Sequence, residues 1–223
     1  MIIIMLGAQG TGKGTVAGLL SKELHIPQIS TGDVFRKNIK DETELGIEAN
    51  KYIAKGNLVP DSVTVPMVIG ELDSDEAKNG AILDGFPRTI AQAEKLDEIL
   101  KERNEKIDLV VNLTSPREEI ITRIVDRRVC PNCKETFNLK LRPPKVEGIC
   151  DKCGTKLKQR EDDSDEQSIK NRLDTYDRET SPLVNYYNQK GVLRTEEISL
   201  RVNRFGAEVA KDIVEDFKKE GKI

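Results

Sequence analysis

The chain has 223 residues, of which 37% are hydrophobic and 34% charged, and its formal net charge is -3. This length allows one substantial core with one or two small insertions, and the small negative charge argues against a protein that coats nucleic acid. No apolar run reaches the ~20 residues that span a bilayer, and the opening MIIIMLG lacks the basic leader of a signal peptide. The sequence therefore predicts a cytoplasmic protein that does not act in a membrane.

Buried strands and amphipathic helices alternate along most of the chain. The predicted strands are residues 2–6, 27–30, 81–84 and 109–113. The predicted helices cover residues 13–24 and 31–55, begin again at residues 61, 89 and 115, and return at 165–187 and 204–219. Strands joined by helices of this length predict an α/β fold, doubly wound, with a parallel sheet, helices on both faces and a ligand at the carboxyl ends of the strands.

The first predicted strand runs directly into the glycine-rich sequence GAQGTGKGT. Glycines adopt backbone conformations that let successive N–H groups converge on phosphate oxygens at the start of a helix. A flexible turn that merely contains a lysine is the alternative, but the position between a buried strand and a helix favours a phosphate-binding loop of the P-loop NTPase type. The predicted contacts are Gly10, Gly12, the cation of Lys13, Gly14 and the hydroxyl of Thr15.

A carboxylate and several arginines occupy positions suited to a charged ligand. Asp84 ends the third predicted strand, where it would repel a nucleotide unless Mg²⁺ lay between them; a helix cap is the alternative. Arg123 and Arg127 are four residues apart, so on one helix they would share a face and hold one phosphate together. Any single arginine is more often a solvated surface residue. The candidates for neutralising phosphoryl charge are Arg36, Arg88, Arg123, Arg127, Arg160 and Arg172.

The alternation stops between residues 129 and 163, which contain four cysteines and little apolar periodicity. Cys130, Cys133, Cys150 and Cys153 form Cys-x2-Cys-x16-Cys-x2-Cys, a spacing typical of tetrahedral zinc. Two disulfides are the alternative, which a cytoplasmic location disfavours. Four thiolates leave zinc no open position, so the predicted metal is structural.

Taken in order and spacing, the glycine loop, Ile29–Asp33, Leu83–Thr89 and Arg123–Arg128 resemble the adenylate kinase family, and the resemblance covers nearly the whole chain. It implies reversible phosphoryl transfer between ATP and AMP. It also implies a core of residues 1–29, 60–128 and 164–223, an AMP-binding helical insertion at 30–59 and a zinc-bound lid at 129–163.

The resemblance also assigns roles to individual residues. Arg123 and Arg127 would join the glycine loop in binding ATP, and Asp162 and Asp163 would make contacts that form when the lid closes. Without the resemblance, these two aspartates are part of an acidic run typical of a solvated loop. AMP would be held by Thr31, Arg36, Gly85, Arg88, Gln92, Arg160 and Arg172.

Some features depart from the family pattern or leave other functions open. Gln9 and Thr11 replace a proline and a small residue in the glycine loop, Asn57 replaces a basic residue, and residues 196–200 do not match the segment that contacts the ATP adenine. The alternatives are a UMP, CMP or GMP kinase, which the long lid disfavours, and a zinc-ribbon ATPase that binds nucleic acid, for which the lid has few aromatic residues. The predicted partners are ATP, AMP and ADP, without nucleic acid or membrane, and the predicted state is a monomer.

Overall fold

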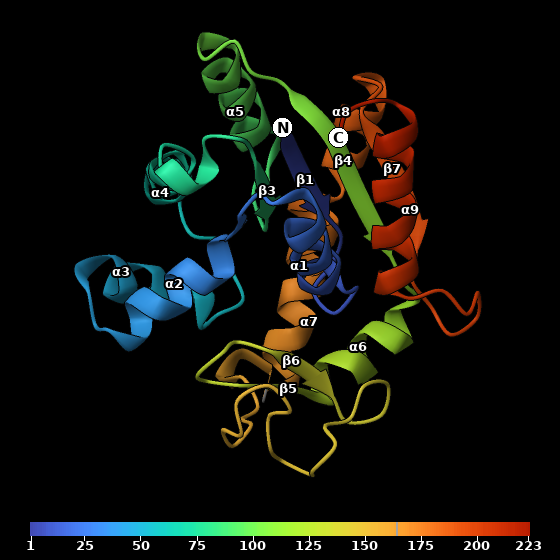
Figure 1. Cartoon of the computed structure of the whole chain (residues 1–223). Coiled ribbons are helices and arrows are strands. Elements are labelled where there is room, and N and C mark those ends of the chain that lie inside the picture. The colour runs from blue at the N-terminus through green and yellow to red at the C-terminus, as the bar shows by residue number, and fades with distance from the viewer. Residues whose placement is uncertain (164) are drawn as a thin grey trace.

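A five-stranded parallel sheet forms the centre of the computed structural model, which describes residues 1–163 and 165–223 (Figure 1). The strand order is β2-β3-β1-β4-β7, and every neighbouring pair is parallel. The strands are β1 (Ile2–Leu6), β2 (Gln28–Ser30), β3 (Ala81–Asp84), β4 (Ile107–Thr114) and β7 (Leu193–Glu197). The predicted α/β class is confirmed, and the four strands predicted from the sequence correspond to β1, β2, β3 and β4.

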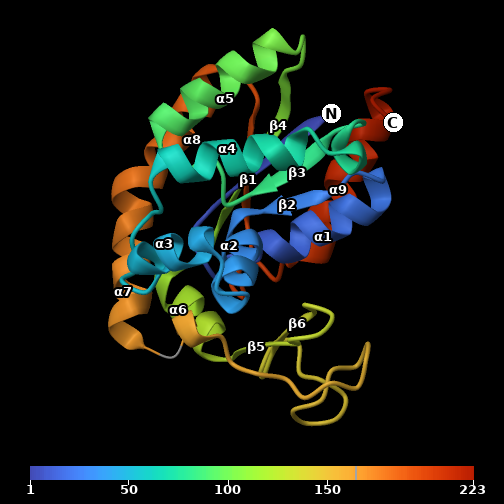
Figure 2. The same cartoon turned by 90° about the vertical axis from the view of Figure 1, so that its left-hand side faces the viewer.

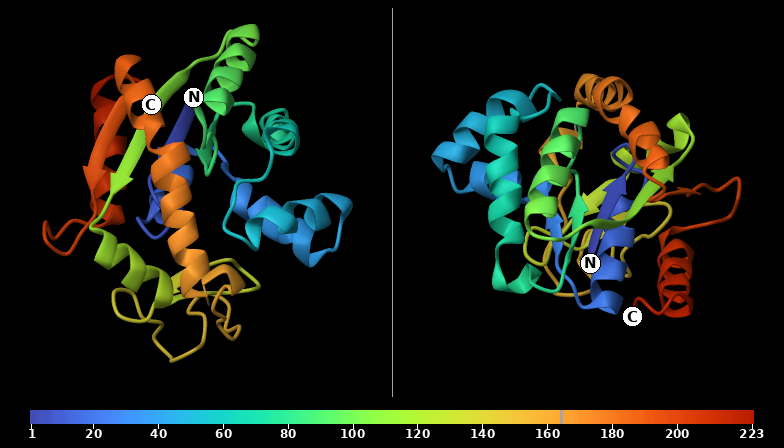
Figure 3. Two further views of the ribbon diagram at one scale, coloured as in Figure 1. Left: turned by 180° about the vertical axis from the view of Figure 1, so that it is seen from behind. Right: turned by 90° about the horizontal axis from the view of Figure 1, so that it is seen from above.

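Helices cover both faces of this sheet (Figures 2 and 3). Ile3 and Met5 of β1 pack with α1 (Lys13–Leu24) and α9 (Gly206–Lys219). The other face of β1, with Ile2 and Ile4, packs with α4 (Asp61–Leu72), α5 (Ile90–Glu102) and α8 (Pro182–Gln189). Since both faces of β1 are buried, the strand is a continuous apolar run rather than an alternating one.

A first excursion leaves the sheet after β2. It contains α2 (Thr31–Lys40) and α3 (Glu44–Ile53), which pack around Phe35 and Ala49. The sequence predicted helical structure through residue 55, but the chain turns between these two helices, where Glu42 has a φ of 52°. The Ser30 hydroxyl accepts the Asp33 N–H at 3.3 Å and so caps α2.

A second excursion follows α6 (Arg117–Val125) and lies at the opposite end of α7 (Glu166–Thr175) from the helices α5 and α8 (Figure 1). It contains the antiparallel strands β5 (Arg127–Val129) and β6 (Thr136–Asn138) and the cysteine loops, and it ends in a 3-10 turn at Glu161–Asp163. The chain returns through α7 (Glu166–Thr175), a π-helical turn at Tyr176–Thr180, and α8. A short 3-10 turn at Asp75–Ala77 precedes β3.

The sequence predicted neither the β5–β6 hairpin nor β7. Residues 193–197 read LRTEE and are mostly half-buried, so they show no apolar strand pattern, and pairing with the edge of β4 makes them a strand. The last of the three predicted core segments, 164–223, begins at residue 164, which lies outside the described residues. Among the described helices, none is both long and apolar enough to cross a membrane.

Candidate active site

The glycine loop connects β1 to α1 at the carboxyl end of the sheet. Gly7, Gly10 and Gly12 have positive φ angles of 132°, 84° and 98°. A Cβ at Gly7 would lie 2.4 Å from the Leu113 carbonyl oxygen, so only glycine fits there. Gly12 precedes the first turn of α1, and no side chain from the described part of the chain caps this helix. The loop therefore presents helix N–H groups without the usual side-chain partner, as an anion site requires.

Lys13 lies folded over this loop. Its Nζ donates to the carbonyl oxygens of Gly7 at 2.6 Å and Ala8 at 2.9 Å. Burial lowers the pKa of Lys13 to about 8; Asp84 opposes this shift, and nearby arginines, Arg88 first among them, add to it. A phosphate placed on the loop would supply the negative charge that favours the protonated lysine.

The carboxyl end of β3 brings several predicted residues together. Asp84 Oδ2 accepts a hydrogen bond from Gln28 Nε2 at 3.1 Å and lies 3.6 Å from where a Cβ on Gly14 would be, so the carboxylate faces the glycine loop. Thr31 Oγ1 and Arg88 Nε both donate to the Gly85 carbonyl oxygen, at 3.0 and 2.8 Å. Gly85 has a φ of 85°, and a Cβ there would meet Thr31 Oγ1 at 2.7 Å.

Two further side chains hold the backbone of Arg88. Gln92 is buried, and its Oε1 accepts the Arg88 N–H at 2.7 Å while its Nε2 donates to Asp61 Oδ1 at 2.6 Å. Thr180, from the π-helical turn, donates to the Arg88 carbonyl oxygen at 2.9 Å. The loop that carries Arg88 is therefore fixed from α5 and from the α7–α8 connection.

Positive charge concentrates around Arg88. Burial lowers the pKa of Arg88, Asp84 opposes the shift, and the charges of Arg36, Arg172 and Arg160 lower it further. Arg36 lies on α2 and pairs with Asp33 at 2.5 Å. These arginines are only partly exposed, and cations that repel one another in such a setting are stabilised by anions among them, so the cluster suits a phosphate-bearing ligand.

Asp162 and Asp163 supply part of that negative charge. Asp163 accepts Arg127 Nε and Nη2, both at 2.7 Å, and Arg172 Nη2 at 3.0 Å. Asp162 accepts Arg160 Nε and Nη2 at 3.0 and 2.7 Å and Arg172 Nη1 at 3.0 Å. Burial disfavours the Asp162 carboxylate, but Arg160 and Arg172 outweigh it and hold its pKa well below the usual range.

The predicted shared helix face of Arg123 and Arg127 is wrong. The helix α6 ends at Val125, and Arg127 belongs to β5, where it pairs in register with Asn138. Arg127 therefore turns to Asp163, whereas Arg123 Nη1 donates to Ser115 Oγ at 2.9 Å. The helix ends two residues before Arg127, and Arg127 instead pairs with β6, the second strand of the hairpin.

The sequence did not single out several residues that shape this site. Gln28 contacts Asp84, Ser115 contacts Arg123, and Thr180 contacts the Arg88 loop. Gln28 and Asp84 are 56 residues apart, and Thr180 and Arg88 are 92 residues apart, so no local motif could signal these two contacts.

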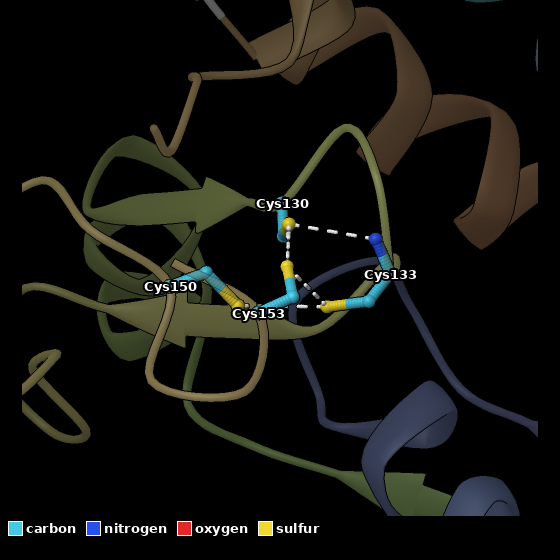
Figure 4. Close-up of side chains that lie close together, drawn as sticks. All are labelled: Cys130, Cys133, Cys150 and Cys153. Carbon is cyan, nitrogen blue, oxygen red and sulfur yellow. Dashed lines mark hydrogen bonds between the residues drawn. The ribbon is translucent and has the colours of Figure 1, made fainter. Parts of the chain in front are cut away.

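The four cysteines of the second excursion come together in one cluster (Figure 4). Their Sγ atoms all lie within 4.8 Å of one another, and the Cys130–Cys153 and Cys133–Cys150 pairs are 3.4 and 3.5 Å apart. All four are free thiols, so the alternative of two disulfides is not what the structure shows. Zinc–sulfur bonds of about 2.3 Å place tetrahedral sulfurs about 3.8 Å apart, so the cluster fits a four-coordinate metal.

Comparisons with known proteins agree with this geometry. The family model described as "Adenylate kinase" matches residues 5–192. A curated "Adenylate kinase" of Caldicellulosiruptor bescii is 52% identical over 193 residues, which are 86% of this chain and 89% of that protein. Proteins of the same name from Clostridium kluyveri and Caldanaerobacter subterraneus subsp. tengcongensis are 50% and 48% identical, over 92% and 98% of this chain and 94% and 95% of their own lengths.

Proposed function

Since the chain belongs to the adenylate kinase family, we propose that it transfers a phosphoryl group reversibly between ATP and AMP to give two ADP. The observation that carries the proposal is the position of Lys13 beside the arginine cluster around Arg88, at the carboxyl ends of neighbouring strands. Phosphoryl transfer needs two phosphate-bearing substrates placed end to end and cations over the group that moves between them.

In this proposal the donor triphosphate lies on the glycine loop. Gly10, Gly12 and Gly14 provide backbone N–H groups, and the Lys13 ammonium leaves the loop carbonyls to follow the migrating charge. Asp84 and the Thr15 hydroxyl would hold Mg²⁺ or its bound waters, because the Asp84 carboxylate faces the loop. When bound, the metal neutralises phosphate charge.

The acceptor AMP lies across the carboxyl end of β3. Thr31 and Arg88 are held to the Gly85 carbonyl, and the close approach at Gly85 leaves room only for hydrogen, which suits contact with a flat base. The other proposed AMP contacts are Arg36, Gln92, Arg160 and Arg172. AMP binding would have to separate Arg36 from Asp33, a half-exposed pair that costs little to break.

The two excursions supply the moving parts. We propose residues 30–59 as the AMP-binding domain, residues 129–163 as the lid and the remainder as the core. Arg127, Arg160 and Arg172 are now paired with Asp162 and Asp163, and substrate phosphates would compete for these guanidinium groups as the lid closes. Closure would then exclude water from the transfer step.

The four thiolates would hold zinc as a structural metal. The metal would contribute folding free energy to a lid whose own buried cluster is small. A monomeric state, a cytoplasmic location and the absence of a nucleic-acid partner remain predictions within this proposal.

The test measures ADP formed from ATP and AMP by the purified chain. Much slower transfer to UMP, CMP and GMP supports the AMP assignment, whereas a better rate with any of these would replace it with another kinase of the same fold. ATP hydrolysis that nucleic acid stimulates without AMP would instead support a nucleic-acid-binding ATPase. Arg88→Ala should lose most of the transfer activity, and the exposed Lys106→Ala is the matched control.

A further inference from the structure

One carboxylate joins α6 to a loop that follows β7. Glu119 Oε2 accepts Arg123 Nη2 at 2.8 Å and the Leu200 peptide N–H at 3.1 Å. Arg123 Nη2 also donates to the Ile198 carbonyl oxygen at 3.1 Å. Glu119 thus holds together two segments whose contacting residues are 81 positions apart.

These segments lie directly against the glycine loop. A Cβ at Gly12 would meet Ile198 Cδ1 at 3.7 Å, and a Cβ at Gly10 would meet Ile124 Cγ1 at 3.0 Å. Ile124 of α6 and Ile198, at the start of segment 198–204, therefore lie beside the loop. Residues 119–124 and segment 198–204 are together called the side wall. The family match ends at residue 192, so the second half of this side wall lies beyond it.

The Arg123 guanidinium is fixed within this side wall. Its side chain is only 10% exposed, and its two terminal nitrogens donate to Ser115, Glu119 and Ile198. Its Nε is buried and has no hydrogen-bond partner among the residues that the structure describes. A guanidinium whose terminal N–H groups are engaged in its own plane can still offer its flat face, which packs well against ring systems.

Glu119 supplies the counter-charge in this arrangement. Its side chain is 20% exposed, and it is the carboxylate paired with Arg123. Burial lowers the pKa of Arg123, and the attraction of Glu119 opposes that shift. Without the carboxylate, the guanidinium would lose its counter-charge and the Leu200 N–H its acceptor. The Ile198 carbonyl oxygen would still accept Arg123 Nη2 and Ser115 Oγ, so the side wall would loosen at Leu200 rather than at Ile198.

We propose that Glu119 is a positioning residue of the donor site: it fixes Arg123 and segment 198–204 as one surface against which the nucleoside part of the triphosphate packs. The inference rests on the proposed function and deepens it. The glycine loop binds the phosphates, whereas the side wall that Glu119 holds binds the nucleoside. A change at Glu119 should therefore weaken the binding of ATP but not the binding of a ligand that consists of phosphates alone.

The experiment compares Glu119→Ala and Glu119→Gln with the exposed neighbour Glu118→Gln. The kinetic readouts are the KM for ATP, the KM for AMP and kcat, and calorimetry measures direct binding of ATP and of inorganic tripolyphosphate. Glu119→Ala should raise the KM and Kd for ATP about tenfold, the effect of losing a charge-assisted hydrogen bond. Glu119→Gln should show a smaller increase, because its amide oxygen still accepts one of the two donors. Glu118→Gln should match the unchanged protein.

The KM for AMP, kcat and tripolyphosphate binding should stay within about twofold in all three variants. An equal loss of ATP and tripolyphosphate binding would overturn the proposal, because Glu119 would then support the glycine loop as a whole. Unchanged ATP binding in Glu119→Ala would overturn it as well. If Glu119→Ala does not fold, Glu119→Gln carries the test. If the unchanged protein makes no ADP from ATP and AMP, the proposed function fails, and the two calorimetric titrations still decide the role of Glu119.

Discussion

Replacing Asp163 by asparagine should destabilise the protein strongly, although the two side chains have the same shape. The Asp163 side chain is fully buried and accepts three hydrogen bonds from Arg127 and Arg172, whose side chains are only 16% and 15% exposed. An asparagine keeps one acceptor oxygen and turns an NH₂ group toward a guanidinium. Two nearly buried cations then lose their shared counter-charge, which costs about 3–5 kcal/mol.

For a chain of this length, each kcal/mol shifts the Tm by about 2–4 °C, so Asp163→Asn should lower the Tm by about 6–20 °C. The matched control is Asp174→Asn, because Asp174 pairs with Arg117 at 2.9 Å but is 64% exposed. An exposed pair contributes at most about 1 kcal/mol, so the control should change the Tm by a few degrees at most. Thermal unfolding followed by circular dichroism at low and at 1 M salt measures both.

The salt series separates the two kinds of ion pair. Salt screens exposed charges strongly and buried charges little, so the effect of Asp163→Asn should persist at 1 M salt while any effect of Asp174→Asn disappears. Saturating ADP should recover part of the loss in Asp163→Asn, because its phosphates would supply the missing negative charge. A Tm for Asp163→Asn equal to that of the control would refute the reasoning that this carboxylate balances the charge of the arginines.

Three further predictions concern the lysine, the second aspartate and the cysteines. Bound phosphates should raise the lowered pKa of Lys13, so ADP binding at pH 8–9 should take up protons. Calorimetry in two buffers should show less proton uptake in Lys13→Met than in the control Lys106→Met. Equal proton uptake in the two variants would contradict this prediction. The pKa of Asp162 is lower in the folded than in the unfolded protein, so the stabilisation from its carboxylate is complete above about pH 4 and is lost as the pH falls further. The Tm of Asp162→Asn should therefore depend less on pH between pH 4 and 2 than the Tm of the unchanged protein. Parallel curves of Tm against pH for the two proteins would contradict this prediction. Replacing Cys150 and Cys153 by serine should remove bound zinc, measured by atomic absorption, and lower the Tm while sparing most ADP formation well below it. A folded double variant without turnover would mean that the metal takes part in the reaction.

The sequence was sufficient where structure depends on neighbours along the chain. The apolar run of β1 and the glycines after it could be recognised because burial on both faces and positive φ angles leave few other residues possible. The Cys-x2-Cys pairs likewise predict a metal site, because each pair forms its own tight turn. These local requirements were enough for the α/β class and for the phosphate loop.

The tertiary structure alone decided where distant residues meet. β7 is a strand only because β4 offers it a free edge, and Arg127 faces Asp163 rather than Arg123 because its partner strand lies in the β5–β6 hairpin. Glu119 reaches the Leu200 N–H across 81 positions, a distance over which no sequence spacing carries information. The partner of a polar side chain depends on which groups the folded backbone brings within about 3 Å of it. Because hydrogen bonds weaken steeply with distance and angle, the residue type by itself does not determine that partner.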